Sequence, residues 1–329
     1  MSIESINQPL VSIIVITYNS ALYVLETLES AKKQTYQNIE LIVSDDCSTD
    51  NTEILCKNWL TDNHTRFAGT KLITTKKNTG IPSNCNRGAN ASTGKWIKFI
   101  AGDDLLSSKY FEILLSYVFQ SEYNIKALCS NHFIFQDKNT SFEKKTNFQS
   151  TNYFLESNIA YDQFQFALRS AGTVPALTAF INRELFNQIK GFDEEYKYLE
   201  DYPFFLKINQ IGEKVYLVNN PLAYYRKHDC NITKIQDSLI NVVYKNVLEV
   251  KYNYCRKHLP PIEKLGVTHE YIITNFLMLL ANKHNSLLFL CKFLFKYQIF
   301  INPFFIYRNS LKILGKKYKY QKYMNNIIP

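Results

Sequence analysis

The 329-residue sequence lacks the short fingerprints of several large enzyme classes. It has only ten glycines, and it contains no G-x-G-x-x-G, P-loop or G-x-S-x-G pattern. A dehydrogenase or a hydrolase of these kinds therefore has no support. Its seven cysteines include no C-x-x-C pair and form no zinc-type cluster with histidine. Scattered cysteines in an odd number are typical of reduced thiols in a cytosolic protein.

Long apolar runs and an export signal are also missing. Lys292 and Lys296 interrupt the most apolar part of the tail, so no run of about 20 apolar residues could span a bilayer. Residues 1–9 are polar and lack the basic, apolar and small-residue regions of a signal peptide. We therefore expect a cytoplasmic protein that does not cross the membrane.

Negative charge is absent from the C-terminal part of the chain. No acidic residue follows Glu270, whereas nine Lys and Arg residues do, so the net charge of +9 lies entirely beyond this point. Lysines interleaved with Phe, Tyr, Leu and Ile are typical of a segment resting on the inner face of an anionic bilayer. A helical cap and a homo-oligomer contact are the alternatives. No nucleic-acid partner is expected, because no binding module is recognisable and residues 1–270 are charge-balanced.

Apolar strand-like runs alternate with helix-like stretches over the first part of the chain. Strands are predicted at residues 11–16, 39–43 and 95–100. This pattern indicates an α/β fold with a mostly parallel sheet flanked by helices. We expect a catalytic domain over residues 1–235 and a helical C-terminal region over residues 236–329.

Two predicted helices follow the first two strands, over residues 23–33 and 49–60. Their apolar positions recur at roughly helical spacing and are expected to pack on the sheet. These positions are Leu22, Leu25, Leu28 and Ala31 in the first helix, and Ile54, Leu55 and Trp59 in the second.

Each of the three strands ends in polar residues. The tips are Thr17-Tyr18-Asn19, Asp45-Asp46 and Gly102-Asp103-Asp104. Open α/β sheets bind ligands at the carboxyl ends of their strands. Adjacent carboxylates there can hold Mg²⁺ or Mn²⁺ against a diphosphate. The tips therefore predict a metal-dependent nucleotide transferase.

Five sequence blocks, taken in order, resemble those of a known enzyme family. The blocks are S-I-I-V-I-T-Y-N from Ser12, S-D-D-C-S-T-D-N-T from Ser44, N-T-G from Asn78, A-G-D-D from Ala101 and L-E-D-Y from Leu199. In order and spacing the chain resembles the inverting family-2 glycosyltransferases of GT-A fold, from about residue 9 to residue 230. The resemblance implies a nucleotide-sugar donor, with UDP expected, and a saccharide acceptor.

The resemblance also implies donor contacts. Thr17, Tyr18 and Asn19 would line the donor site, and Asp45 or Asp46 would accept hydrogen bonds from the base or ribose. Capping of the following helix is the alternative for the two aspartates.

Two cysteines and an arginine depart from the family pattern. Cys47 stands where the family usually has glycine, so a positive φ there would be strained. Cys85 replaces the family arginine, and Arg87 follows two residues later. Arg87 could bind the diphosphate or be an ordinary surface residue.

A metal site is implied at the third tip. Asp103 aligns with the usual ligand of Mn²⁺ or Mg²⁺, although Ala101 replaces the first aspartate of the family motif. Asp104 would orient the loop or contact donor hydroxyls. His228, in the segment Y-R-K-H, completes the metal shell in some family members, and the alternative is a structural histidine.

The catalytic base is implied in the last block. Asp201 aligns with the carboxylate that takes the acceptor proton, and Glu200 would support it or bind the acceptor. Helix capping is the alternative.

The resemblance also implies an acceptor. Family members with such tails often extend lipid-linked oligosaccharides, which here predicts a polyprenyl-diphosphate-linked acceptor in bacterial surface polysaccharide assembly. The residues of 136–170 are interpreted as an acceptor-facing insertion. A catalytically degenerate domain that binds sugar or serves as a scaffold remains the alternative function.

Overall fold

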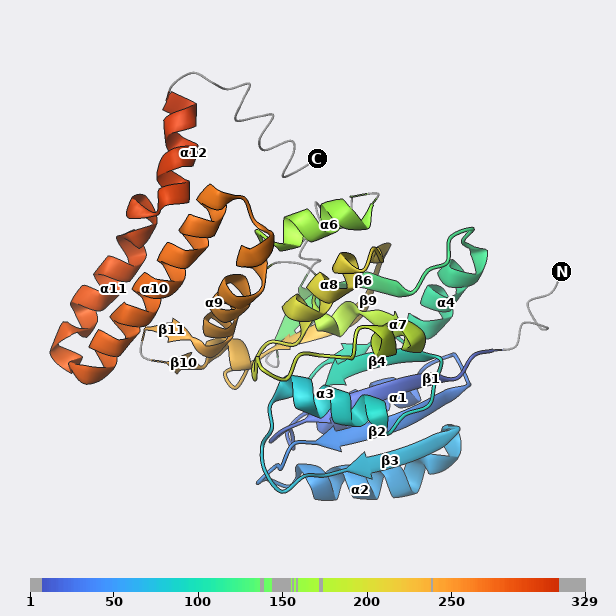
Figure 1. Cartoon of the computed structure of the whole chain (residues 1–329). Coiled ribbons are helices and arrows are strands. Elements are labelled where there is room, and N and C mark those ends of the chain that lie inside the picture. The colour runs from blue at the N-terminus through green and yellow to red at the C-terminus, as the bar shows by residue number, and fades with distance from the viewer. Residues whose placement is uncertain are drawn as a thin grey trace.

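The computed structural model describes residues 8–136, 139–143, 155, 157, 159–171, 174–237 and 239–313. Within these ranges nine strands form one sheet, and two short strands form a separate hairpin. Figure 1 shows the sheet in the lower half of the view, with the C-terminal helices stacked beside it. The predicted α/β class with a mostly parallel sheet is confirmed.

The parallel half of the sheet contains the three predicted strands. Its order is β3 (Gly69–Ile73), β2 (Ile39–Asp45), β1 (Val11–Thr17) and β4 (Trp96–Ala101). All neighbouring pairs in this half are parallel. The polar tips after β1, β2 and β4 therefore meet at one edge.

The other half of the sheet is mixed. β8 (Phe180–Asn182) lies antiparallel between β4 and β6 (Ala127–Gln136). Beyond β6 the sheet continues with parallel β9 (Tyr216–Lys227) and antiparallel β5 (Leu105–Leu106). β7 (Asn139–Glu143) pairs with β6.

Two apolar cores cover the two faces of the sheet, because successive strand residues point to opposite sides. Ile14 of β1 packs in the first core, whereas its neighbours Ile13 and Val15 pack in the second. The first core is completed by α3 (Ile81–Asn90), α6 (Ala160–Ala167), α7 (Arg183–Gln188) and α8 (Asp201–Gln210). The second is completed by α1 (Val24–Lys32), α2 (Thr52–Asn63) and α4 (Tyr110–Gln120).

The predicted helix faces are partly wrong. Leu28 and Ala31 of α1 are buried as expected, but Leu22 is 81% exposed and Leu25 is exposed as well. Leu22 precedes the helix, and the buried stripe of α1 is Val24, Thr27, Leu28 and Ala31. In α2, Trp59 is buried and Leu55 partly buried, whereas Ile54 is 61% exposed. α2 begins at Thr52, three residues later than expected, and Ile54 lies about 140° around the helix from Trp59, so the two cannot share one buried face.

The C-terminal region is helical, as expected. A short hairpin of β10 (Gln236–Asp237) and β11 (Ile240–Asn241) leads into α9 (Val242–Asn253), α10 (Pro261–Lys283), α11 (Leu288–Tyr297) and α12 (Pro303–Ile313). Val247 and Val250 of α9 join the first core, which attaches this region to the sheet. Among the helices that the structure describes, none is both long and apolar enough to cross a bilayer. The boundary between a catalytic domain that ends at residue 235 and a C-terminal region that begins at residue 236 stays a prediction.

The interpretation of residues 136–170 as an insertion falls partly outside the described residues. Within the described ones, this segment contains β7 and α6. Phe164 and Ala167 of α6 pack in the first core.

Candidate active site

The tips of β1 and β2 are joined by side-chain hydrogen bonds. Thr17 Oγ1 donates to Asp45 Oδ1 at 2.7 Å, and Ser48 donates to the same carboxylate through its N–H at 2.8 Å and its Oγ at 2.6 Å. Asn19 has a positive φ of 52° and accepts a 2.8 Å hydrogen bond from Thr49 N–H at Oδ1. Asp45 is buried, so its role in this geometry is to fix both tips.

Tyr18 projects from this ordered turn. It is 50% exposed, while the preceding Thr17 is buried. The turn thus presents an aromatic ring and the exposed Asn19 side by side at the sheet edge. An aromatic ring beside polar groups suits a planar base with hydrogen-bonding edges.

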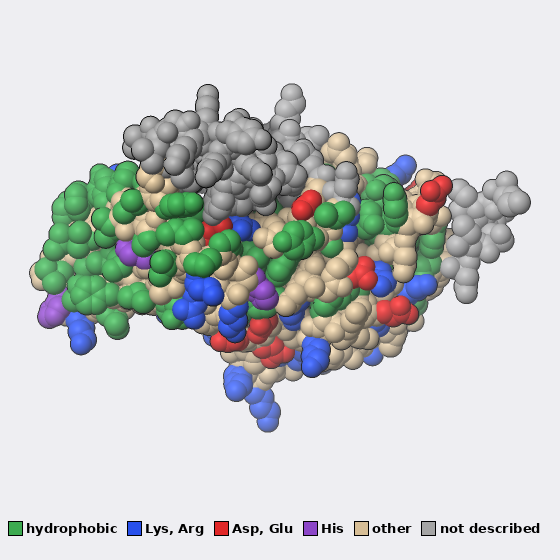
Figure 2. All heavy atoms as spheres, turned by 45° about the horizontal axis from the view of Figure 1, so that its top comes forward, with side chains coloured by type: hydrophobic (Ala, Val, Ile, Leu, Met, Phe, Trp, Pro, Cys, Tyr) green, Lys and Arg blue, Asp and Glu red, His purple; other side chains and the backbone are tan. Residues whose placement is uncertain are grey.

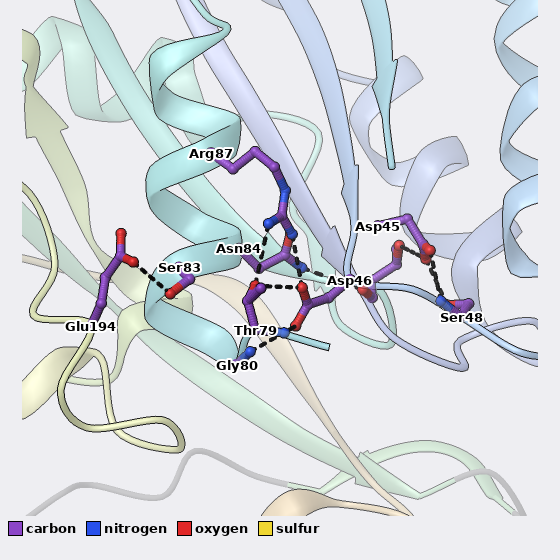
Figure 3. A network of polar contacts seen from close by, with 10 residues as sticks. Asp45, Asp46, Ser48, Thr79, Gly80, Ser83, Asn84, Arg87 and Glu194 are labelled. Atoms are coloured by element: carbon purple, nitrogen blue, oxygen red, sulfur yellow. Dashed lines mark hydrogen bonds and ion pairs between the residues drawn. The ribbon is translucent and has the colours of Figure 1, made fainter. Parts of the chain in front are cut away.

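Asp46 is enclosed by hydrogen-bond donors (Figure 3). Its Oδ2 accepts from the N–H groups of Thr79 at 2.9 Å and Gly80 at 2.8 Å, and its Oδ1 accepts from Thr79 Oγ1 at 2.6 Å. Arg87 Nη2 adds an ion pair to Oδ1 at 2.9 Å. These hydrogen bonds, opposed by burial, hold the pKa of Asp46 below its ordinary value. The carboxylate therefore organises the N-T-G loop at the start of α3.

Arg87 points into the same network. Besides Asp46, it donates from Nη2 to Asn84 Oδ1 at 2.8 Å and from Nη1 to Thr79 Oγ1 at 3.2 Å. Its guanidinium thus ties α3 to the tip of β2, and a diphosphate contact stays a prediction. The strained backbone expected at Cys47 is present, with a φ of 67°.

Asp103 and His228 meet at the tip of β4. His228 Nε2 lies 2.9 Å from Asp103 Oδ2, although 125 residues separate the two. The ring of Tyr23 lies beside the imidazole, tilted by 34°, with ring centroids 4.7 Å apart. Gly102 allows this tip to approach β1 closely, because a Cβ there would lie 2.9 Å from Thr17 Cγ2. An oxygen and an imidazole nitrogen are a donor set that Mn²⁺ accepts.

Arg226 holds the loop that carries Asp103. Its Nε donates to the carbonyl oxygen of Asp103 at 2.8 Å, and its backbone N–H donates to Asp104 Oδ1 at 2.9 Å. The guanidinium is buried between the rings of Tyr23 and Phe135 and pairs with Glu26 at 2.7 Å. Asp104 is buried, so it orients the loop in this geometry.

Glu200 and Asp201 lie at the N-terminus of α8. Asp201 Oδ1 accepts a 2.7 Å hydrogen bond from Tyr202 N–H. Burial raises the pKa of Asp201, and hydrogen bonds from Tyr202, from its own N–H and from Ala176 oppose the rise. Burial, followed by the charge of Asp201, raises the pKa of Glu200 further. Both pKa values are raised, to about 8 for Glu200 and about 6 for Asp201, so Asp201 is the carboxyl group that loses its proton at the lower pH.

The short helix at residues 176–178 links this pair to β4. The backbone of its first residue, Ala176, helps to oppose the rise in the pKa of Asp201. The carbonyl of Leu177 accepts a hydrogen bond from Lys98 Nζ, and Lys98 is a buried residue of β4. The candidate base is thus connected through one turn of chain to the strand that ends at the candidate metal ligand.

Sequence reasoning missed Tyr23 and Glu26. Both support Arg226 or His228 from the first turn of α1 and the residue before it. Glu26 lies outside the buried stripe of α1, and placing the start of this helix correctly would have shown this from the sequence. No local motif marks Tyr23, because its partners lie 200 residues along the chain.

Comparison with known proteins shows which family this chain resembles. The family model described as "Glycosyl transferase family 2" matches residues 12–190. The chain is 27% identical to an uncharacterized glycosyltransferase of Haemophilus influenzae over 254 residues, which cover 75% of each chain. It is 26% identical to the minor teichoic acid biosynthesis protein GgaB of Bacillus subtilis over 270 residues, which are 79% of this chain and 28% of GgaB.

Solved structures share the fold at low sequence identity. Residues 1–349 of TarS from S. aureus, in complex with UDP-GlcNAc, align with a TM-score of 0.56 and 18% identity over 80% of this chain and 71% of that one. A mannosyltransferase from Pyrobaculum calidifontis, in complex with GDP-Man and Mn²⁺, aligns with a TM-score of 0.53 and 14% identity over 94% and 76%. With more than half of its length matched by the family model, the chain belongs to glycosyl transferase family 2.

Proposed function

We propose that this protein transfers a sugar from a UDP-sugar to a hydroxyl group of a saccharide acceptor, with inversion at the anomeric carbon. The observation that carries the proposal is the contact of Asp103 with His228 at the strand edge that Tyr18 and Asn19 also flank. Asp201 would supply the carboxylate that takes the acceptor proton, and the N–H of Tyr202 at the start of α8 opposes the rise that burial causes in its pKa.

The tips of β1 and β2 have different roles in the proposed donor site. A carboxylate has about four acceptor positions, and Asp46 already receives four hydrogen bonds from Thr79, Gly80 and Arg87. We therefore assign Asp46 to shaping the site. Tyr18 and Asn19, which are exposed, are assigned to the base and ribose.

Asp103 and His228 would hold Mn²⁺ or Mg²⁺. Within the described ranges no three His, Cys, Asp or Glu side chains converge on a possible metal site. The remaining ligands would then be diphosphate oxygens and water. When bound, the cation would neutralise the charge that develops on the departing UDP. Arg226 keeps the Asp103 carbonyl in place throughout.

Asp201 acts as the general base. It takes the proton of the acceptor hydroxyl while that oxygen forms a bond to the anomeric carbon. The bond from this carbon to the donor phosphate oxygen breaks at the same time, and UDP leaves on the opposite face. Glu200, protonated more readily than Asp201, can donate a hydrogen bond to the acceptor without competing as a base.

The proposed setting is the assembly of a bacterial surface polymer on a polyprenyl-diphosphate-linked saccharide at the inner face of the membrane. GgaB is named for teichoic acid biosynthesis, which supports this setting. Acceptor specificity is assigned to residues 136–180.

The test is nucleotide release from a panel of UDP-, GDP-, CMP- and dTDP-sugars, with Mn²⁺ or with EDTA. We expect release from a UDP-sugar that needs the metal and disappears in Asp201→Asn. Release from another class only would overturn the UDP assignment. If the protein binds UDP but releases nucleotide from no donor, even with bacterial lipid extract present, the degenerate scaffold is favoured. Ala101, in place of the first aspartate of the family motif, is the residue that most supports this alternative.

A further inference from the structure

An exposed apolar stripe runs along α10. Leu265, Ile272, Phe276 and Leu279 are all more than half exposed. At 100° per residue, these four positions lie within about 60° of one another around the helix. Lys283 continues the stripe at its C-terminal end, since it follows Leu265 by five full turns.

The acidic residues of α10 are turned away from this stripe. Glu263 and Glu270 lie about 140° or more from Leu265 around the helix. Glu263 is buried and pairs with Arg169 at 2.8 Å, and Glu270 accepts a hydrogen bond from Tyr244 of α9 at 2.7 Å. The exposed face of α10 therefore carries no negative charge.

The next segments extend the same kind of surface. α11 packs on α10 through buried Cys291, which contacts the cluster of Leu277 and Ala281. Its opposite side exposes large apolar residues, and the turn after it exposes three more: Phe289, Leu290, Phe293, Leu294 and Tyr297, then Ile299, Phe300 and Ile301. Phe289 is 83% exposed. Figure 2 shows hydrophobic side chains gathered over this end of the molecule.

The charge of this surface indicates the kind of partner that it binds. Lys283, Lys292 and Lys296 are exposed on it, and the sequence contains no acidic residue after Glu270. A second copy of the chain would bring only further positive charge to the same face, which disfavours self-association. A bilayer with anionic lipids offers both an apolar layer and complementary charge.

We propose that the exposed faces of α10 and α11, with the turn after α11, dock the protein on an anionic membrane surface. The large apolar side chains enter the boundary between headgroups and acyl chains, while the three lysines contact lipid phosphates. Docking stands on this C-terminal surface and not on the donor assignment, so it holds even if the UDP-sugar proposal fails.

The experiment is flotation of the full-length protein with vesicles. One set contains phosphatidylcholine alone, and the other contains about 30% phosphatidylglycerol. We expect at least about tenfold more binding to the anionic vesicles, reduced by high salt. Absence of binding to anionic vesicles would overturn the proposal.

Two triple variants separate the contributions. Phe276→Ser/Phe289→Ser/Phe293→Ser removes apolar contacts, and Lys283→Gln/Lys292→Gln/Lys296→Gln removes charge. Each is expected to lower binding at least about tenfold. Matched controls on the sheet domain are Ile54→Ser/Tyr123→Ser and Lys33→Gln/Lys57→Gln/Lys109→Gln, whose side chains are also exposed. These should bind as the parent does.

Folding and self-association are read out in parallel. Circular dichroism and the melting temperature show that each variant is folded. Light scattering gives the oligomeric state. A parent dimer that the serine triple variant converts to monomer, without vesicle binding by either, would assign the face to a contact between copies instead. Equal loss of vesicle binding in the control variants would also contradict the proposal.

Discussion

His228 Nε2 lies 2.9 Å from Asp103 Oδ2, so the end of β9 closes on the tip of β4. The two residues meet because β5, which follows Asp104, pairs with β9 just before His228. Arg226 reinforces the contact by binding the backbone of Asp103 and the carboxylate of Asp104. The imidazole nitrogen of His228 and the carboxylate of Asp103, the proposed metal ligands, are thereby held together on two different segments.

Replacement of His228 by Ala is expected to weaken metal binding. Loss of one ligand should raise the Mn²⁺ concentration for half-maximal activity about 10- to 100-fold. The measurement is a Mn²⁺ titration of UDP release. His64→Ala is the matched control, because His64 is exposed near α2. An unchanged Mn²⁺ requirement in a folded His228→Ala protein would assign the histidine a structural role.

Asp201→Asn should abolish turnover and spare donor binding. The amide keeps the size of the side chain but cannot take the acceptor proton, so we expect kcat to fall by about 10³-fold or more. The dissociation constant for UDP should change less than about threefold. Calorimetry and a coupled assay measure the two quantities. A variant with parental kcat would remove Asp201 as the base.

The pH dependence should follow the raised pKa of Asp201. Burial raises this pKa to about 6, and the base must be ionised, so activity is lost as pH falls through that value. We expect kcat/KM at saturating Mn²⁺ to rise with pH and level off near neutrality. A rate that stays constant down to pH about 4, the ordinary value for aspartate, would contradict the assignment.

Asp46→Ala should destabilise the fold strongly. It leaves the N–H groups of Thr79 and Gly80 and the guanidinium of Arg87 without their common acceptor. We expect a loss of about 3 kcal/mol in the free energy of unfolding. Urea denaturation measures it, with exposed Asp62 replaced by Ala as the control. A loss below about 1 kcal/mol would show that the loop is held by other contacts.

Strands β1, β2 and β4 and their polar tips were predictable from sequence because each is a largely apolar run. A polar residue at the carboxyl end of such a run marks where the strand ends. Helix faces were less predictable: Leu22 is exposed because it lies before the start of α1, and Ile54 is exposed because it lies about 140° around α2 from buried Trp59.

Side-chain partners across the site were predictable only where a sequence block fixed them. The resemblance put Asp103 and His228 in one site, and the structure brings them into contact. It did not indicate that Asp46 and Arg87 pair with each other, because it implies a ligand contact for each. Such pairing depends on how α3 lies against β2, which spacing alone does not specify.

The most direct test of the central claim is calorimetric titration of UDP into the parent protein and Asp103→Asn, each with and without Mn²⁺. If Asp103 holds the cation against the diphosphate, Mn²⁺ should tighten UDP binding at least about tenfold in the parent and leave the variant unchanged. Equal tightening in both proteins, or none in the parent, would contradict the account.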